Sequence, residues 1–410
     1  MSTKRRVLLV AYQFPPVGGA GVQRVTKFAK YLPAHGWDVS VLTVSNPSVP
    51  VVDQSLLEDV PPETLICRAK SFEPDYRVKQ SLAGGDAGRS RDAARGSEGQ
   101  AAGGNKTKTA RGGFRSWIKS WVKSAATTLL QPDPQILWAP HAIRDGLKLL
   151  RSVPHDAILV SGPPFSSFLI GAVLARRTGL PLVLDYRDEW SISNRYWENK
   201  SRNPLTLWVQ RKMQRYALRR TDLAIATTTR SADSIGEEAR LAGRDVPARC
   251  IYNGYDPEDV DHDTTADARH HSVAGEHRFR ISHVGTLWNL TTSRPLVEAI
   301  ERLAAESPAL AARLDIEFVG RCTPGESELI ERLRSLPCRL LRQDYVDHSA
   351  AVQVMSDADQ LCLLLADVPG AERVVPGKTF EYLATGRELL TIAPPGELRD
   401  LVQPFGGVST

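Results

Sequence analysis

The sequence lacks the features that mark secreted, membrane-spanning or metal-bridged proteins. Five cysteines, an odd number, are scattered through the 410 residues and form no Cys-x-x-Cys pair. This pattern is typical of a reduced cytoplasmic protein and predicts neither a disulfide framework nor a zinc site. No apolar run reaches membrane-spanning length, and the basic residues 4–6 lead into a strand pattern instead of a signal-peptide core. We therefore expect a soluble, cytoplasmic protein, and leave open its peripheral attachment to the inner face of the plasma membrane.

The chain also has little excess charge and no dinucleotide-binding fingerprint. Its formal net charge is +5 and its pI is near 8.9, which is too small a basic excess to predict a nucleic-acid partner. The first glycine-rich loop, residues 13–21, contains Gly18, Gly19 and Gly21 but does not match G-x-G-x-x-G. An NAD-dependent oxidoreductase is therefore disfavoured. The same glycines allow a backbone to approach a ligand closely, or to adopt a positive φ in a tight turn.

What the chain does contain is a repeated alternation of strand and helix patterns. Its length predicts two domains, and its 42% hydrophobic and 24% charged residues are ordinary for a globular enzyme. The chain opens with a strand pattern, the glycine-rich loop, a helical pattern at 22–35 and another strand pattern. This order is typical of the start of a doubly wound α/β domain. Strand patterns continue at residues 156–161, 181–185, 222–227, 248–252, 280–285, 314–319, 339–341 and 361–365. We therefore predict two successive α/β domains, at residues 1–255 and 256–410.

Residues 84–123 interrupt this alternation. Residues 84–113 are rich in Gly, Ala, Ser and Arg and nearly free of apolar bulk, so we expect a disordered insertion. Residues 114–123 place Phe114, Trp117, Ile118, Trp121 and Val122 on one helical stripe that basic residues flank. Such a stripe suits a helix lying in an anionic membrane interface, and equally an amphipathic helix that covers the protein's own core. Both interpretations stay open.

The stretch 373–386, RVVPGKTFEYLATG, has the strongest local signature. It follows a buried-strand pattern, continues through Pro376 and Gly377, and becomes a short helical pattern that ends at Gly386. A strand–loop–helix unit of this kind aims backbone N–H groups at an anion such as a phosphate. Lys378 would add a positive charge, and Glu381 a carboxylate that accepts from a pair of sugar hydroxyls. The two fit a nucleotide with a ribose and a diphosphate; the alternative is an i,i+3 surface pair on a solvated helix.

A second charged cluster follows the strand pattern at 181–185. Asp185, Arg187, Asp188 and Glu189 lie at or just past its carboxyl end, where open α/β sheets bind ligands. One interpretation is a carboxylate and a guanidinium that face a reacting sugar, and the other is an ion-pair network that holds a loop. Two D-x-D patterns, at residues 261–263 and 357–359, lie in an expected linker and at a helix end. We therefore predict no metal site from them.

Taken together, these segments resemble the GT-B glycosyltransferases of family four, the group 1 glycosyl transferases. The matching segments are residues 14–24 (FPPVGGAGVQR), 185–190 (DYRDEW), 253–256 (NGYD), 284–286 (VGT) and 376–386 (PGKTFEYLATG). Their order and spacing make the signal specific, and they cover most of the fold. The resemblance implies an α/β, GT-B fold with two Rossmann-like doubly wound domains facing a central cleft. It also implies sugar transfer from a nucleotide diphosphate with retention of configuration, no cofactor and no obligatory metal.

The resemblance also assigns roles to residues of this chain. Glu381 would bind the ribose hydroxyls of the donor, and Lys378 with the loop 374–377 would lie against its diphosphate and sugar. Asp188, together with Arg187, would face the sugar or acceptor from the first domain. Positioned cations would neutralise the charge of the leaving group without a metal. The predicted catalytic residues are Asp188, Arg187, Lys378 and Arg294, and the predicted donor-binding residues are Gly18, Gly19, Gly21, Gly285, Glu372, Val375, Gly377 and Glu381.

The chain departs from the pattern of the resembled family at several positions. With Glu381 as the second glutamate of its E-x7-E motif, Arg373 stands at the first position and Glu372 lies beside it. Thr286 and, further on, Arg294 replace the usual Arg and Lys after the first strand of the second domain. The chain stops at Thr410, before the last strand and helices of such relatives, so we expect a second domain that is truncated or closed differently.

The partners follow from the same resemblance. We expect a nucleotide-sugar donor, with UDP favoured, and a polysaccharide or glycolipid precursor of the cell envelope as acceptor. A membrane helix at 114–123 would favour a lipid-linked acceptor and an anionic membrane surface as a further partner. Two alternatives stay open. One is a nucleotide-sugar 2-epimerase of the same fold, which needs several acid/base carboxylates around the sugar, and the other is a degenerate protein that binds a nucleotide sugar without turnover.

Overall fold

The computed structural model of the chain describes residues 4–49, 51–74, 130–196, 204–259 and 278–409. The expected insertion at 84–113, the stripe at 114–123 and almost all of the expected linker at 259–276 lie outside these residues. The chain divides into two compact units. The first comprises Met1–Leu182 and Ser201–Arg220, and the second comprises Val183–Lys200 and Thr221–Thr410.

The first unit is built around parallel strands in the order β3-β2-β1-β4. Three consecutive residues of β1, Leu8, Leu9 and Val10, are fully buried. A strand that is buried at successive positions is covered on both faces, as in a doubly wound sheet. In chain order the elements are β1 (Arg5–Val10), α1 (Ala20–Tyr31), β2 (Trp37–Val44), β3 (Leu65–Ala69), α4 (Ala139–Ser152), β4 (Ala157–Gly162), α5 (Ser166–Thr178) and α7 (Pro204–Leu218), with 3₁₀ turns at Leu32–His35, Ser55–Leu57 and Pro134–Trp138.

The second unit holds two groups of parallel strands and their helices. The first group is β5 (Leu182–Tyr186), α6 (Trp190–Tyr196), β6 (Leu223–Ala226), α8 (Thr229–Leu241) and β7 (Ala248–Cys250). The second group is β8 (Phe279–Val284), α10 (Arg294–Glu306), α11 (Pro308–Ala311), β9 (Leu314–Val319), α12 (Pro324–Glu331), β10 (Arg339–Gln343), α13 (His348–Asp357), β11 (Gln360–Leu364), α14 (Lys378–Ala384), β12 (Glu388–Ile392), α15 (Glu397–Val402) and β13 (Val408–Ser409). Short 3₁₀ turns lie at Pro257–Asp259, Arg332–Ser335, Ala371–Arg373 and Gln403–Phe405.

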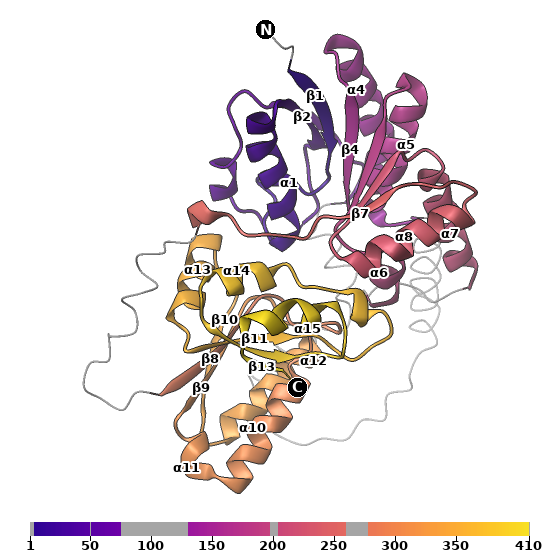
Figure 1. Cartoon of the computed structure of the whole chain (residues 1–410). Coiled ribbons are helices and arrows are strands. Elements are labelled where there is room, and N and C mark those ends of the chain that lie inside the picture. The colour runs from indigo at the N-terminus through magenta and orange to yellow at the C-terminus, as the bar shows by residue number, and fades with distance from the viewer. Residues whose placement is uncertain (1–3, 50, 75–129, 197–203, 260–277, 410) are drawn as a thin grey trace, which may run out of the picture. The chain divides into compact units, whose positions relative to one another are not determined.

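The sheet β10-β9-β8-β11-β12-β13 has an apolar core on each of its faces. Leu361, Leu363 and Leu365 pack with α13, α14 and α15, whereas Cys362 and Leu364 pack with α10 and α12. Figure 1 shows α10 on the opposite side of this sheet from α13, α14 and α15. The uninterrupted apolar run at 361–365 therefore encodes a central strand that is buried on both faces.

The predicted α/β class with two doubly wound parallel sheets is confirmed. Along the whole chain the sheet orders are β3-β2-β1-β4-β5-β6-β7 and β10-β9-β8-β11-β12-β13. The predicted boundary at residues 255/256 lies between β7, the last strand of the first sheet, and β8, the first strand of the second. The compact units divide the chain elsewhere, because residues 183–200 and 221–256 group with the C-terminal sheet. The boundary therefore stays a prediction, and the sequence patterns did not predict β3, β12 or β13.

Candidate functional site

The carboxyl end of β8 leads into a backbone that only glycine adopts without strain. Gly285, the residue after β8, has a φ of +140°, and Gly320, the residue after the neighbouring β9, has a φ of +126°. A Cβ at Gly320 would lie 2.5 Å from the carbonyl oxygen of Gly285. The two turns can therefore pack together only because Gly320 lacks a side chain. They lie at the edge where open parallel sheets bind ligands.

The amine of Lys378 lies directly against Gly285. Its Nζ is 2.8 Å from Nε2 of His283, and a Cβ at Gly285 would lie 2.5 Å from the same amine nitrogen. Nδ1 of His283 is 2.9 Å from the carbonyl oxygen of Cys362 in β11. Because a carbonyl oxygen can only accept, Nδ1 carries the hydrogen and Nε2 accepts from the lysine amine. The hydrogen bond from Nδ1 to the backbone of β11 fixes the imidazole of His283, and Nε2 of this imidazole then orients the Lys378 amine.

This arrangement perturbs both titrating groups. Burial, with a further contribution from the charge of Lys378, lowers the pKa of His283 well below its usual range, so the imidazole is neutral at pH 7. Burial also lowers the pKa of Lys378 to about 7, against smaller opposing effects of Cys362 and Glu381. Among the residues that the structure describes, no carboxylate forms an ion pair with the Lys378 amine. An anion bound here would supply the opposite charge and favour the ammonium form.

Helix α14 carries Lys378 and is tied to β8 by Tyr382. The phenol hydroxyl donates to the carbonyl oxygen of Val284 at 3.1 Å and accepts from the N–H of the same residue at 2.7 Å. Glu381 is partly exposed, and its Oε1 lies 3.9 Å from Nε2 of His348. Lys378 and Glu381 therefore do not form the i,i+3 surface pair that the sequence left open, since each side chain meets a different histidine.

A second cluster in the same unit centres on the buried carboxylate of Glu189. Arg373 donates to both of its oxygens, with Nε–Oε2 and Nη2–Oε1 distances of 2.8 and 3.1 Å. The hydroxyls of Ser191 and Ser234 also donate to Oε1. Only 5% of the Glu189 side chain is exposed. For Glu189, the structure supports the ion-pair interpretation of the charged cluster after β5.

Arg373 and Glu372 lie in the 3₁₀ turn that precedes α14. Nη1 of Arg373 donates to Oε1 of Glu372 at 2.9 Å, and Oε2 of Glu372 accepts from the N–H of Gly370 at 2.9 Å. The first position of the family's E-x7-E motif is therefore a guanidinium whose charge Glu189 and Glu372 both neutralise. The adjacent glutamate is held by the turn itself, and its predicted contact with a donor stays a prediction.

Glu397 adds a further contact within this unit by capping α8. Its carboxylate accepts from the N–H groups of Thr229 and Arg230, at 2.6 and 2.9 Å, and from the hydroxyl of Tyr252 at 2.6 Å. A carboxylate at a helix N-terminus satisfies N–H groups that lack partners in the helix and interacts favourably with the helix dipole. Like the Glu189–Arg373 pair, this cap joins a segment that follows a strand of the first sheet to the C-terminal part of the chain within the second unit.

The structure places Asp188 and Arg187 directly after β5. Asp188 is exposed, yet the surrounding protein desolvates its carboxylate enough to raise its pKa above the usual Asp range, against an opposing effect of the Arg187 charge. The carbonyl oxygen of Arg187 accepts from the hydroxyl of Thr227, 3.0 Å away, after β6. Both residues thus lie at the carboxyl edge of parallel strands, as expected. Their catalytic role toward a sugar stays a prediction.

Arg294 begins α10 and lies at the surface. Its Nη1 is 3.7 Å from Oε1 of Glu298, and both side chains are more than half exposed. The N-terminus of α10 is instead capped by the buried Glu326, whose carboxylate accepts from the N–H of Ser293 and from the hydroxyl of Thr292, at 2.7 and 2.6 Å. The role of Arg294 as a phosphate ligand stays a prediction.

The remaining predicted residues of the second unit flank α14. Val375 is buried in the apolar core that α14 covers, so its side chain positions the loop before the helix. Gly377 immediately precedes α14, and a Cβ there would lie 3.6 Å from Nδ2 of Asn253. This is an ordinary contact distance, so the position has room for a larger residue.

The three glycines of the first loop belong to the other compact unit. A Cβ at Gly18 would lie 2.7 Å from Cγ1 of Val51, and Gly19 has a φ of +99° at the start of α1. Gly21 lies in the first turn of α1. Gly18 is therefore needed by the packing of Val51 and Gly19 by its backbone conformation, and the approach of all three glycines to a donor stays a prediction.

The sequence patterns missed His283 and the partners of Glu189. A histidine inside the apolar strand pattern at 280–285 is a usable signal, because a buried polar side chain needs a hydrogen-bond partner. The Glu189–Arg373 pair joins residues 184 positions apart. No local pattern marks such a contact.

Residues 18–254 match the family model of the glycosyl transferase 4-like domain. The match spans more than half of the chain. The chain belongs to the glycosyl transferase 4-like family. The predicted family resemblance is thus confirmed, and the protein is a glycosyltransferase. A search among proteins of curated function finds no sequence match.

Solved structures resemble this glycosyltransferase over nearly its whole length. HepE of Anabaena, in complex with UDP and glucose, is 14% identical with a TM-score of 0.54 and covers 97% of this chain and 83% of its own. The UDP-forming α,α-trehalose-phosphate synthase of Burkholderia vietnamiensis is 12% identical with a TM-score of 0.57, over 99% and 88%. WaaG, a glycosyltransferase involved in lipopolysaccharide biosynthesis, is 13% identical with a TM-score of 0.52, over 98% and 85%. At these identities the likeness shows the GT-B fold with two Rossmann-like domains, which confirms the predicted fold class.

The described residues contain neither a cluster of metal ligands nor a membrane-spanning helix. In these parts of the glycosyltransferase, no group of three or more His, Cys, Asp or Glu side chains could hold a metal ion. No helix there is long and apolar enough to cross a membrane. The expected absence of a cofactor and of an obligatory metal stays a prediction.

Proposed function

We propose that this glycosyltransferase moves a sugar from a nucleotide diphosphate, with UDP favoured, to a polysaccharide or glycolipid precursor of the cell envelope, retaining the anomeric configuration. The family membership supports transfer, and the UDP complex of HepE and the UDP-forming synthase support the nucleotide. The involvement of WaaG in lipopolysaccharide biosynthesis supports an envelope acceptor.

The observation that carries the donor site is the Lys378 amine, which His283 holds against Gly285 at the carboxyl edge of the sheet. In the proposed complex this amine binds the donor diphosphate and neutralises the charge that the leaving nucleotide develops. Glu381, one turn further along α14, accepts from the ribose hydroxyls. Asp188 and Arg187 act on the side of the sugar and acceptor.

A thermal-shift screen with UDP, GDP, dTDP and ADP tests the donor site. A ligand that binds only the folded protein stabilises it by about 2.7 kcal/mol at a hundredfold excess over Kd. One nucleotide is expected to raise the melting temperature of the wild type, and Glu381→Ala is expected to lose most of that shift. Glu298→Ala, which removes an exposed carboxylate from α10, is the matched control and should keep it. A shift that Glu381→Ala keeps in full contradicts the assignment of the ribose site.

A second candidate function follows from Arg373. The first glutamate position of E-x7-E holds a guanidinium that Glu189 and Glu372 neutralise. The alternative to a transferase is therefore a protein that binds the donor without turning it over. Release of UDP from a bound UDP-sugar, with water or acceptor, distinguishes the two. Tight donor binding without UDP release, in the presence of envelope lipid extract as acceptor, would favour the binding protein.

We also propose a cytoplasmic site of action, with peripheral attachment to the membrane through residues 114–123 and without a resident cofactor or metal. The support for the attachment is the stripe of aromatic and basic residues in the sequence. Trp117→Ser with Trp121→Ser is expected to weaken binding to anionic vesicles, and unchanged binding would contradict this role of the stripe.

A further inference from the structure

Helix α7 of the first unit has its polarity reversed over residues 204–214, whereas Ala217 and Leu218 near its C-terminus are buried as expected. Its buried positions include the polar residues Thr206, Gln210 and Gln214. Its exposed positions include Leu205 and Trp208, each 57% exposed. A helix that served only to cover the core would place these classes the other way round. The buried polar face is nevertheless satisfied in part, since Nε2 of Gln210 donates to Gln131 and to the carbonyl oxygen of Pro132.

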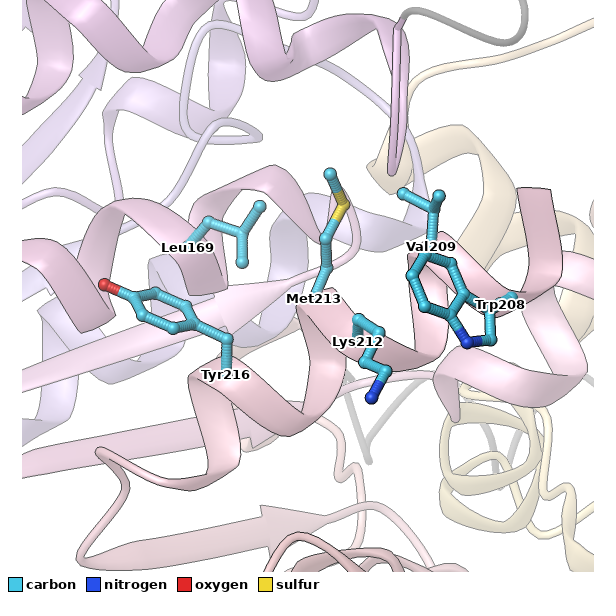
Figure 2. A pocket seen from close by; sticks show the side chains of 6 residues that line it. All are labelled: Leu169, Trp208, Val209, Lys212, Met213 and Tyr216. Carbon is cyan, nitrogen blue, oxygen red and sulfur yellow. The ribbon is translucent and has the colours of Figure 1, made fainter. Parts of the chain in front are cut away.

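An apolar groove runs along the same helix, between α7 and α5. Figure 2 shows the indole of Trp208 near one end and the phenol of Tyr216 near the other, with Met213 between them. Val209 of α7 and Leu169 of α5 complete its apolar lining, and Lys212 lies at its side. The exposed Trp208 of α7 therefore belongs to the lining of this groove and is not an isolated apolar side chain.

The charged residues of helix α7 have one sign. Residues 204–220 contain five basic residues and no acidic one. Four of the basic residues are exposed, namely Arg211, Lys212, Arg219 and Arg220. The ammonium of Lys212 lies 5.5 Å from the centre of the Trp208 ring, so a cation and an aromatic ring are presented together. Exposed apolar residues at one end and cations beside them are the two components of an interfacial helix.

Charge decides between the occupants of this face. A second copy of the chain that presented this same face would bring its own cations against the four exposed ones, which repel them. Anionic lipid headgroups attract basic residues and give the tryptophan an interface in which to lie. We infer that the face of α7 formed by Leu205, Leu207, Trp208, Arg211 and Lys212 binds an anionic lipid bilayer.

This inference deepens the proposed membrane attachment by assigning it to a second face, and it does not depend on the proposed donor and acceptor. Vesicle binding is measured without nucleotide, so failure of the donor site leaves the result unaffected. Membrane binding would place the enzyme beside lipid-linked substrates, whichever sugar it transfers.

Vesicle co-sedimentation of the full chain tests the inference. Vesicles of phosphatidylcholine with 30% phosphatidylglycerol are compared with pure phosphatidylcholine at low and at 0.5 M salt. The wild type is expected to bind the anionic vesicles and to dissociate at high salt. Arg211→Glu with Lys212→Glu should lower the partition coefficient at least about 25-fold, since each lost cation accounts for about fivefold. Trp208→Ser as a single change should lower the partition coefficient severalfold, at low salt and at high salt alike.

Matched controls separate this face from the rest of the molecule. Leu310→Ser removes an apolar side chain that is 49% exposed in the other unit, and its binding should equal that of the wild type. Circular dichroism checks that each variant is folded. Wild type that fails to bind anionic vesicles overturns the inference. So does unchanged binding by the α7 variants, including the case in which only Trp117→Ser with Trp121→Ser abolishes binding. A dimer in sedimentation velocity that Trp208→Ser dissociates would assign the face to a second copy and overturn it too.

Discussion

The lowered pKa of Lys378 gives a quantitative prediction for donor binding. In the free protein this amine has a pKa of about 7, chiefly because burial disfavours its charge. The titrating groups around it are His283, whose Nε2 accepts from the amine, together with Cys362, Glu381 and Tyr382. If the donor diphosphate binds only the ammonium form, binding raises the pKa of Lys378 and takes up a proton. Affinity must then fall as the pH rises above 7.

The size of the effect follows from the fraction of ammonium in the free protein. With a pKa of 7 this fraction is about one half at pH 7 and about one hundredth at pH 9. Affinity should therefore fall about 50-fold over this range, which corresponds to about 2.3 kcal/mol. Below pH 6 the amine is almost fully charged, so affinity should level off. Proton uptake on binding should rise from about 0.1 at pH 6 to about 0.9 at pH 8.

Isothermal titration calorimetry with UDP-glucose measures both quantities. UDP-glucose is a better probe than UDP, because a terminal phosphate itself titrates near pH 6. Titrations in two buffers of different ionisation enthalpy give the number of protons taken up. Lys378→Met should bind weakly at every pH and show no proton uptake. Wild-type affinity that is constant between pH 7 and pH 9, without proton uptake, would refute the contact between Lys378 and the diphosphate.

Two further predictions concern the scaffold around the site. Gly285→Ala should weaken donor binding at least about tenfold, because the new Cβ would lie 2.5 Å from the Lys378 amine. It should also lower the melting temperature, because a φ of +140° costs about 1–3 kcal/mol for residues other than glycine. Calorimetry and thermal unfolding measure the two effects, and Gly325→Ala, where a Cβ has open space, is the control. Glu189→Gln should destabilise the second unit by about 3 kcal/mol in chemical denaturation, because it leaves the Arg373 guanidinium without its buried partner. The exposed pair of Glu298 with Arg294 gives the control, and Glu298→Gln should lower the free energy of unfolding by less than about 0.5 kcal/mol. An equal effect of Glu189→Gln and Glu298→Gln would contradict the argument.

The architecture could be predicted from the sequence because the central strands of parallel sheets appear as uninterrupted apolar runs. The run at 361–365 is apolar at every position since β11 is buried on both faces. The strand patterns that were predicted all correspond to strands, whereas β3, β12 and β13 were missed. β3 has an exposed burial pattern and β13 has two residues, so neither carries a periodic apolar signal.

For the candidate site, the sequence determined which residues carry charge, and the tertiary structure decided what each charge meets. Lys378 and Glu381 stand out in a loop–helix segment, but only the packing of α14 on β8 brings the amine to His283 and gives it a pKa of about 7. Arg373 is visible as a departure from E-x7-E, yet its neutralisation by Glu189 depends on a contact across 184 residues. The reversed polarity of α7 likewise exists only once its neighbours define which face is buried. Local patterns record periodicity and burial, whereas electrostatic environment depends on groups that are close in space and distant in sequence.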